Sequence, residues 1–218
     1  MKQAEKHISD KINTIKYGKQ TRTWDVSDEI TIAWKGVLPL PPANNGATTK
    51  KELAYLSKLT SNRTTEQENL IKLIDKEPLD LYYQVLKKYN LKMPKKIFDK
   101  AWSTVRPVVM NLKWKHNRPR PHQLADKYGI PLKVIHTDSA QTPAYPSGHT
   151  AYGALAAYVL SATYPEYSSE FFGLVGEVGM GRMLQGVHYP SDNEASMVIT
   201  GALWEDIRYR MFPELTNF

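Results

Sequence analysis

Apolar residues recur at helical spacing along most of this chain, and no stretch shows the two-residue alternation that is typical of a half-buried strand. Leu53, Leu56 and Leu59, for example, lie three residues apart, so they share one face of a helix. Polar or proline-rich stretches separate the periodic segments. We therefore predict an all-α fold, a compact helical bundle.

Caps and prolines indicate where these helices begin and end. Thr64 and Gln67 have the spacing of an N-terminal capping box, and Pro94 suits the first turn of a long helix. Pro107 lies inside that helix and should kink or divide it. Loop signals dominate residues 119–146, which we predict to be one long loop. The expected helices cover residues 49–59, 64–74, 79–89, 94–116, 150–162, 168–184 and 191–211.

The length of 218 residues suits one domain, which we place at 23–218 after a polar N-terminal arm at 1–22. With 41% apolar and 23% charged residues, the composition is that of a soluble globular protein. No apolar run reaches the roughly 20 residues that span a bilayer, so we expect no transmembrane segment. No signal peptide is visible, and a cytoplasmic location is the default expectation.

Two counts limit the chemistry. The chain has no cysteine, which excludes disulfides, thiol catalysis and cysteine-based zinc sites. Its 29 Lys and Arg against 22 Asp and Glu give a net charge of +7, which favours anionic partners such as phosphoesters, nucleic acid or acidic membranes. No helix-turn-helix or similar motif is present, so we expect a small phosphorylated substrate and no nucleic acid.

Three short segments carry the chemistry, namely KWKHNRPRP at Lys113–Pro121, PSGH at Pro146–His149 and RMLQGVHYPSD at Arg182–Asp192. Together they supply fixed cations, two histidines and a carboxylate. Lysine acts as a compact point charge and arginine as a planar fork that matches phosphate oxygens. Several cations around one dianion stabilise the charge that develops during phosphoryl transfer.

The second and third segments suit anion binding and nucleophilic catalysis. Ser147 and Gly148 lie where a helix should begin, and backbone N–H groups there favour an anion. His188 and Asp192 are four residues apart, so the carboxylate can orient the imidazole and leave one ring nitrogen unprotonated. The structural alternatives are a plain helix cap for Ser147, and a capping aspartate beside a buried histidine.

In this order the segments resemble the signature of the type 2 phosphatidic acid phosphatase (PAP2) superfamily, K-x6-RP, PSGH and SR-x5-H-x3-D. Lys113 and Arg120 fit the first motif, whereas Arg118 has no lysine seven positions before it. Gly181 stands where the family usually has serine, so a hydroxyl near the phosphate is missing. The resemblance implies phosphate binding by Lys113, Arg120, Ser147, Gly148 and Arg182, a general acid at His149, and a nucleophile at His188 oriented by Asp192.

Residues 37–43 (VLPLPPA) and 52–55 (ELAY) are similar to stretches of the bacterial class A non-specific acid phosphatases. That branch implies a metal-independent phosphomonoester hydrolase with a phosphohistidine intermediate, no cofactor, inhibition by vanadate and a possible homo-oligomer. Two alternatives remain open. One is a vanadium haloperoxidase, with vanadate as cofactor and His188 as its ligand, and the other is a lipid phosphatase at a membrane surface. The leaving group is not determined, although residues 138–144 and 38–43 are candidate walls.

Overall fold

The computed structural model describes residues 39–215, and these contain helices and turns without any strand, so the all-α prediction is confirmed. The predicted arm at residues 1–22 lies outside the described residues. The helices are α3 (Ala47–Ser61), α4 (Thr65–Lys76), α5 (Asp80–Lys88), α6 (Lys95–His116), α7 (Pro121–Tyr128), α8 (Gly148–Thr163), α9 (Ser168–Leu184) and α10 (Pro190–Met211). Short 3₁₀ turns cover Asp138–Ala140, Pro165–Tyr167 and Pro213–Leu215.

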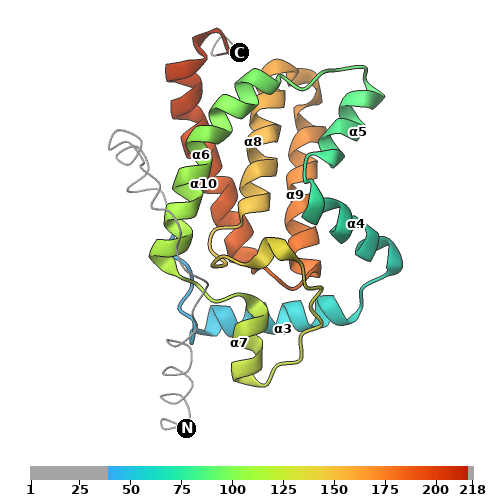
Figure 1. Ribbon diagram of the computed structural model, residues 1–218, viewed down its shortest axis with the longest axis vertical. Coiled ribbons are helices and arrows are strands. Elements are labelled where there is room, and N and C mark those ends of the chain that lie inside the picture. Colours follow the sequence, from blue (N-terminus) through green and yellow to red (C-terminus); the bar gives the residue numbers. More distant parts are fainter. Residues whose placement is uncertain (1–38, 216–218) are drawn as a thin grey trace.

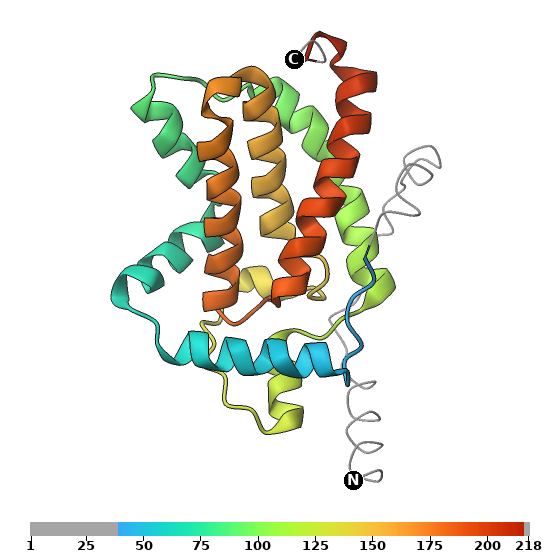
Figure 2. The same ribbon diagram turned by 180° about the vertical axis from the view of Figure 1, so that it is seen from behind.

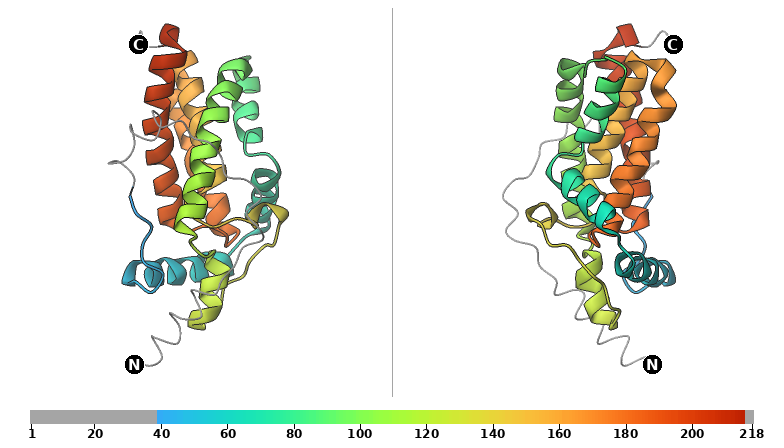
Figure 3. Two further views of the ribbon diagram at one scale, coloured as in Figure 1. Left: turned by 60° about the vertical axis from the view of Figure 1, so that its left-hand side comes forward. Right: turned by 90° about the vertical axis from the view of Figure 1, so that its right-hand side faces the viewer.

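Four long helices, α6, α8, α9 and α10, run side by side, and α3 and α7 lie across one end of this bundle (Figure 1). The view from behind shows α9, α8 and α10 next to one another with α3 crossing beneath them (Figure 2). The side views place α4 and α5 along the flank of the bundle (Figure 3). Helix α8 is central, because it packs against α6, α9 and α10.

The sequence of α8 explains its central place. It is apolar on all sides, as expected of a buried helix. Ala151, Ala154, Ala156 and Ala157 are buried and small, which lets neighbouring helices approach closely. A second, smaller core packs α3 and α7 against the links between helices, and its buried members are Leu53, Leu56, Leu124, Ala125, Ala144 and Tyr189. This second core closes the end of the bundle.

The expected helices are all found, and two local predictions need comment. The capping box is confirmed, because the Thr64 hydroxyl accepts from the Gln67 N–H and the Gln67 side chain accepts from the Thr64 N–H. Helix α6 continues through Pro107 as one element, so the alternative in which this proline divides it is wrong.

The prediction of an uninterrupted loop over 119–146 is wrong, because α7 forms inside it. Pro121 occupies the first turn, where its missing N–H costs nothing, and the Gln123 side chain accepts from the Arg120 N–H at 2.8 Å. Gly129 ends the helix at φ +64°, a conformation that favours glycine. The start and stop residues were present, but the eight residues of α7 are too few to show a helical period.

Within residues 39–215, none of the helices combines the length and the apolarity that crossing a membrane requires.

Candidate active site

The three sequence motifs meet at the end of the bundle that α3 and α7 cover (Figure 1). Helices α6 and α9 end there, and α8 and α10 begin there. Six predicted site residues are buried in this region with exposed fractions of 3% or less. They are Lys113 in the last turn of α6, Arg120 just before α7, Ser147 just before α8, Arg182 near the end of α9, His188 in the following link and Asp192 in the first turn of α10.

Both ring nitrogens of His188 have partners. Nδ1 lies 3.0 Å from Asp192 Oδ2, and Nε2 lies 2.7 Å from Arg120 Nη1. A guanidinium can only donate, so Nε2 must accept, and the proton of the neutral imidazole is on Nδ1. Burial and the nearby cations, Arg120 first, lower the pKa of His188 well below its usual value. His188 is therefore neutral, with its unprotonated nitrogen among the cations.

Arg118, to which the sequence assigned no role, holds the carboxylate of Asp192. Its Nη1 donates to Asp192 Oδ1 at 2.7 Å, and its Nη2 donates to Glu52 Oε2 at 2.9 Å. The guanidinium also lies 3.8 Å from the centre of the Tyr189 ring, and the Tyr189 N–H donates to Asp192 Oδ2 at 3.0 Å. Burial raises the pKa of Asp192, and Arg118 together with this N–H opposes that rise.

Glu52 ties α3 to this group, because its second oxygen accepts from the Ser191 N–H at 2.8 Å. The Glu52 side chain therefore links Arg118 to the first turn of α10. Glu52 is the first residue of the ELAY stretch, so the sequence signal for it was present. Its partner could not be named from the sequence, because Arg118 lies 66 positions away.

Lys113 and Arg120 are held by backbone carbonyls of the link before α8. Lys113 Nζ donates to the carbonyl oxygens of Pro143 at 2.7 Å and Ala144 at 3.3 Å. Arg120 Nε donates to the Thr142 carbonyl at 2.8 Å. Burial, and then the neighbouring Arg120, lower the pKa of Lys113. None of these anchors is a carboxylate, so an incoming anion would not have to displace an ion pair at them.

Arg182 has a carboxylate partner that the sequence did not reveal. Its Nη1 donates to Asp75 Oδ1, and its Nη2 donates to Ser139 Oγ at 2.9 Å. The same Asp75 oxygen accepts from the hydroxyls of Thr137 and Ser139. Burial raises the pKa of Asp75, but the Ser139 and Arg182 hydrogen bonds outweigh it and lower the pKa to about 2. Asp75 is therefore ionised and fixes one edge of the guanidinium.

The third guanidinium nitrogen of Arg182, Nε, is buried without a partner among the described residues. Arg182 Nε has no hydrogen-bond partner in the part of the chain that the structure describes, although the side chain is only 1% exposed. A buried donor without a partner costs about 1–3 kcal/mol. An oxyanion bound beside Arg182 would remove that cost.

The α8 N-terminus supplies Ser147, Gly148 and His149. Ser147 Oγ accepts from the Thr150 N–H at 3.4 Å, so its hydroxyl caps the helix, as the structural alternative predicted. Phosphate binding by Ser147 and Gly148 stays a prediction. A Cβ on Gly148 would lie 3.8 Å from Lys113 Cε, which places this helix terminus next to the lysine.

His149 is held by the backbone of the same aspartate that holds Arg182. Its Nε2 lies 3.2 Å from the Asp75 carbonyl oxygen, which can only accept, so Nε2 carries the proton and Nδ1 of the neutral ring is unprotonated. Burial, and then the cation of Arg182, lower the pKa of His149 to about 3. His149 is therefore neutral in the empty site.

Close packing against α4 explains why position 181 is a glycine. A Cβ at this position would lie 2.6 Å from Cδ1 of Ile74, a fully buried side chain of α4. The serine that is usual in the family would fit here only if the buried Ile74 side chain shifted. The missing Cβ lets α4 lie against α9, and the next residues on these two helices, Asp75 and Arg182, form the ion pair.

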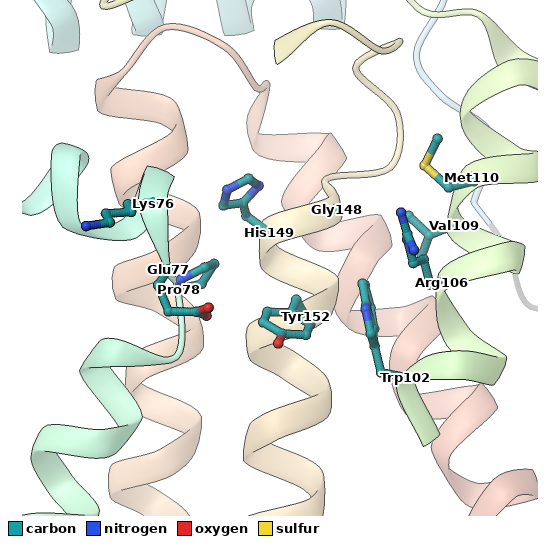
Figure 4. Close-up of a pocket in the computed structure, with 10 residues that line it drawn as sticks. All are labelled: Lys76, Glu77, Pro78, Trp102, Arg106, Val109, Met110, Gly148, His149 and Tyr152. Atoms are coloured by element: carbon teal, nitrogen blue, oxygen red, sulfur yellow. The ribbon is translucent and has the colours of Figure 1, made fainter. Parts of the chain in front are cut away.

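A pocket of about 330 Å³ opens beside this site, between α6, α8 and the link from α4 to α5 (Figure 4). Gly148 and His149 line it, so it adjoins the candidate phosphate site. Its other walls are Lys76, Glu77, Pro78, Trp102, Arg106, Val109, Met110 and Tyr152. Of the two candidate walls, the described residues 39–43 and 139–144 do not line it.

These groups place three buried basic side chains around a neutral histidine whose Nε2 lone pair accepts from Arg120. Among the described residues, no group of three or more histidine, aspartate or glutamate side chains could hold a metal ion.

Sequence comparison agrees with this arrangement. The model of the PAP2 superfamily matches residues 102–215, which is more than half of the chain and includes all three motifs. The chain therefore belongs to the PAP2 superfamily.

Among its relatives are non-specific acid phosphatases. That of Salmonella typhimurium is 46% identical over 55 residues, and that of Providencia stuartii is 40% identical over 55 residues. Each match covers 25% of this chain and 22% of the relative, so the aligned part spans about a fifth of those proteins.

The fold also resembles a solved structure. It is the crystal structure of the first transmembrane PAP2 type phosphatidylglycerolphosphate phosphatase from Bacillus subtilis, with a TM-score of 0.55 and 16% sequence identity. The similarity covers 87% of this chain and 94% of that one. At this level of identity the resemblance concerns the fold alone.

Proposed function

We propose that this protein is a metal-independent phosphomonoester hydrolase that acts through a phosphohistidine on His188. The observation that carries the proposal is the state of His188, whose Nδ1–H donates to Asp192 while Nε2 keeps its lone pair among three buried cations. An imidazole in this tautomer is a nucleophile, and the cations supply the charge stabilisation that a metal ion supplies elsewhere. The related acid phosphatases support the same activity.

Substrate binding requires one local change. In the empty site the Nε2 lone pair of His188 is occupied by Arg120 at 2.7 Å. A phosphate dianion attracts this guanidinium more strongly than a neutral imidazole does, because the hydrogen bond becomes charge-assisted on both sides. Arg120 then moves to a phosphate oxygen, Arg182 Nε finds its partner, and Nε2 is released to attack.

The chemistry follows in two steps. His188 Nε2 bonds to phosphorus as the bond from phosphorus to the leaving oxygen breaks, and protonated His149 gives its Nδ1 proton to that oxygen. Water then attacks phosphorus and loses a proton to His149, while the P–N bond breaks and its electron pair returns to His188 Nε2. The bound dianion raises the pKa of His149 from its low value in the empty site, which provides the acid form.

Replacement of His188 tests the proposal. We expect His188→Ala to lower kcat by at least about 10⁴-fold, because the nucleophile is lost, while sulfate or vanadate still binds to the cations. Activity is measured on 4-nitrophenyl phosphate, with a chelator present to test metal independence. Near-normal turnover by His188→Ala would refute the nucleophile assignment, and loss of wild-type activity with the chelator would refute metal independence.

Vanadate separates this proposal from the haloperoxidase alternative. Vanadate should inhibit the phosphatase activity, whereas peroxide-dependent halide oxidation after vanadate loading would support a haloperoxidase.

A further inference from the structure

We propose that the pocket beside His149 binds the leaving group, and that it selects leaving groups with a planar aromatic ring over polyols. This inference rests on the proposed function, because it assigns a substrate class to the same site. The pocket is about 330 Å³ in volume and lies between α6 and α8 (Figure 4).

The position of His149 connects the pocket to the chemistry. His149 lines the pocket, and the adjacent Gly148 belongs both to the pocket and to the helix terminus beside Lys113. A general acid must lie within hydrogen-bond reach of the oxygen that it protonates. The carbon attached to that oxygen is therefore near His149, and this pocket is the adjoining space that can receive the rest of the leaving group.

Aromatic rings form the far wall. Trp102 and Tyr152 meet edge to face, with ring centroids 4.7 Å apart and planes at 64°, and Phe98 also packs edge to face against Tyr152, with centroids 5.0 Å apart. Trp102 and Tyr152 are both partly exposed, so ring surface faces the pocket. A further ring stacked or set edge-on against such a pair is stabilised beyond the burial of its area.

The other apolar lining suits the same ligand. Val109 and Met110 lie on α6 one turn beyond Arg106, and the side chain of Met110 is drawn toward the pocket (Figure 4). A methionine sulfur makes favourable contacts with aromatic rings. Pro78 adds an apolar surface on the opposite side. These walls would bury ring carbon, and removing apolar surface from water is favourable.

The polar lining fits a polyol poorly. Beyond His149, its polar side-chain groups are the Tyr152 hydroxyl, the Trp102 indole N–H and three charged side chains, of which Lys76 and Arg106 are exposed. A sugar ring would place several hydroxyls against Val109, Met110 and the ring carbons of Trp102, where they have no partner, and burying a hydroxyl without a partner is unfavourable. The pocket is also near the small end of the usual range of about 300–1,000 Å³, which suits one ring system.

Two substrates with primary alcohol leaving groups test this inference, namely 2-phenylethyl phosphate and glucose 6-phosphate. We expect wild-type kcat/KM to be at least about tenfold higher for the phenylethyl ester. Trp102→Ala should lower kcat/KM for that ester about tenfold and leave glucose 6-phosphate within about twofold, while Trp102→Phe keeps most of the preference. Tyr209→Ala, an exposed aromatic on α10, is the control and should change neither value.

Binding to His188→Ala separates the two proposals. Titration calorimetry of both esters on His188→Ala and on His188→Ala with Trp102→Ala should show the same preference without turnover. If the wild type hydrolyses neither ester, the proposed function fails. The affinities of the two esters measured by calorimetry still test whether the pocket prefers an aromatic ring. Equal kcat/KM or affinity for the two esters, or an equal loss for both in Trp102→Ala, would overturn the leaving-group assignment.

Discussion

Each of the two candidate histidines, His188 and His149, is hydrogen-bonded to a group that can only donate or can only accept. Arg120 only donates, so it holds His188 with Nε2 unprotonated, and the Asp75 carbonyl only accepts, so it holds His149 with Nε2 protonated. Their neighbours thus hold the two rings in different tautomers. Burial first, and then the charges of Arg182 and Lys113, oppose the protonation of His149 and explain its low pKa.

At this scale we predict that anion binding takes up a proton at His149. Its pKa of about 3 in the empty site means that the ring is neutral at pH 6, and a bound dianion favours the imidazolium. Sulfate stays dianionic at this pH, so its own titration does not interfere. Calorimetry in buffers of different ionisation enthalpy should show an uptake that approaches one proton per sulfate for the wild type, and little uptake for His149→Gln. Absence of uptake by the wild type would argue against His149 as the acid.

At the scale of elements, the close contact of α4 and α9 positions Arg182. It depends on Gly181, because a Cβ there would lie 2.6 Å from Ile74 Cδ1. The ion pair between Asp75 and Arg182 follows one residue later on each helix. Gly181 is therefore a packing residue, and the departure from the family motif is compensated by α4.

We accordingly predict that Gly181→Ser destabilises the protein by about 1–3 kcal/mol through overpacking, and that it lowers kcat/KM by displacing Asp75 from Arg182. Ile74→Val removes the clashing Cδ1, so the double variant should be more stable than Gly181→Ser alone. Gly173→Ser on the same helix is the matched control, since a Cβ there has nothing within 4 Å. Chemical denaturation measures the stabilities. Equal stability of Gly181→Ser and Gly173→Ser would contradict this account of the α4 contact.

The sequence predicted what is local in this site and missed what is distant. His188 and Asp192 are four positions apart, and Thr64 and Gln67 of the capping box are three positions apart, so both spacings could be recognised directly. Asp75 lies 107 positions before Arg182, and no local period signals that contact. Helix α7 was missed because Pro121 and Gly129 bound a segment too short for a period to appear.

At the scale of the whole molecule, buried neutral histidines make stability depend on pH. Burial first, and then nearby charges such as Arg182 and Arg120, lower the pKa of His149 to about 3 and that of His122 to about 4. In the unfolded chain both titrate near 6.5. Above pH 6.5 they are neutral in both states and contribute no pH dependence. Below it the unfolded chain binds protons that the native state does not, so stability falls as the pH decreases toward 4.

We therefore predict that the free energy of unfolding falls between pH 7.5 and pH 5 by about 2 kcal/mol for His149, and by less for the more exposed His122, whose charge solvent partly screens. Asp75 acts in the same direction at lower pH, because its pKa of about 2 lies below the ordinary 3.8 and its contribution is lost as the pH falls through that window. Urea denaturation at several pH values measures the slope, and His122→Asn should reduce it. Stability that is constant or rises on acidification would contradict the burial of these rings.

The most direct test of the central claim is to trap the phosphoryl group on His188. His149→Ala lacks the base that activates water, while 4-nitrophenyl phosphate needs no acid because its leaving group is already stable as an anion. Mixing the two and quenching in alkali, where phosphohistidine survives, should give a burst of one 4-nitrophenolate per enzyme and a phosphorylated peptide that contains His188. If 4-nitrophenolate is released without any phosphorylated His188, the phosphohistidine mechanism is contradicted.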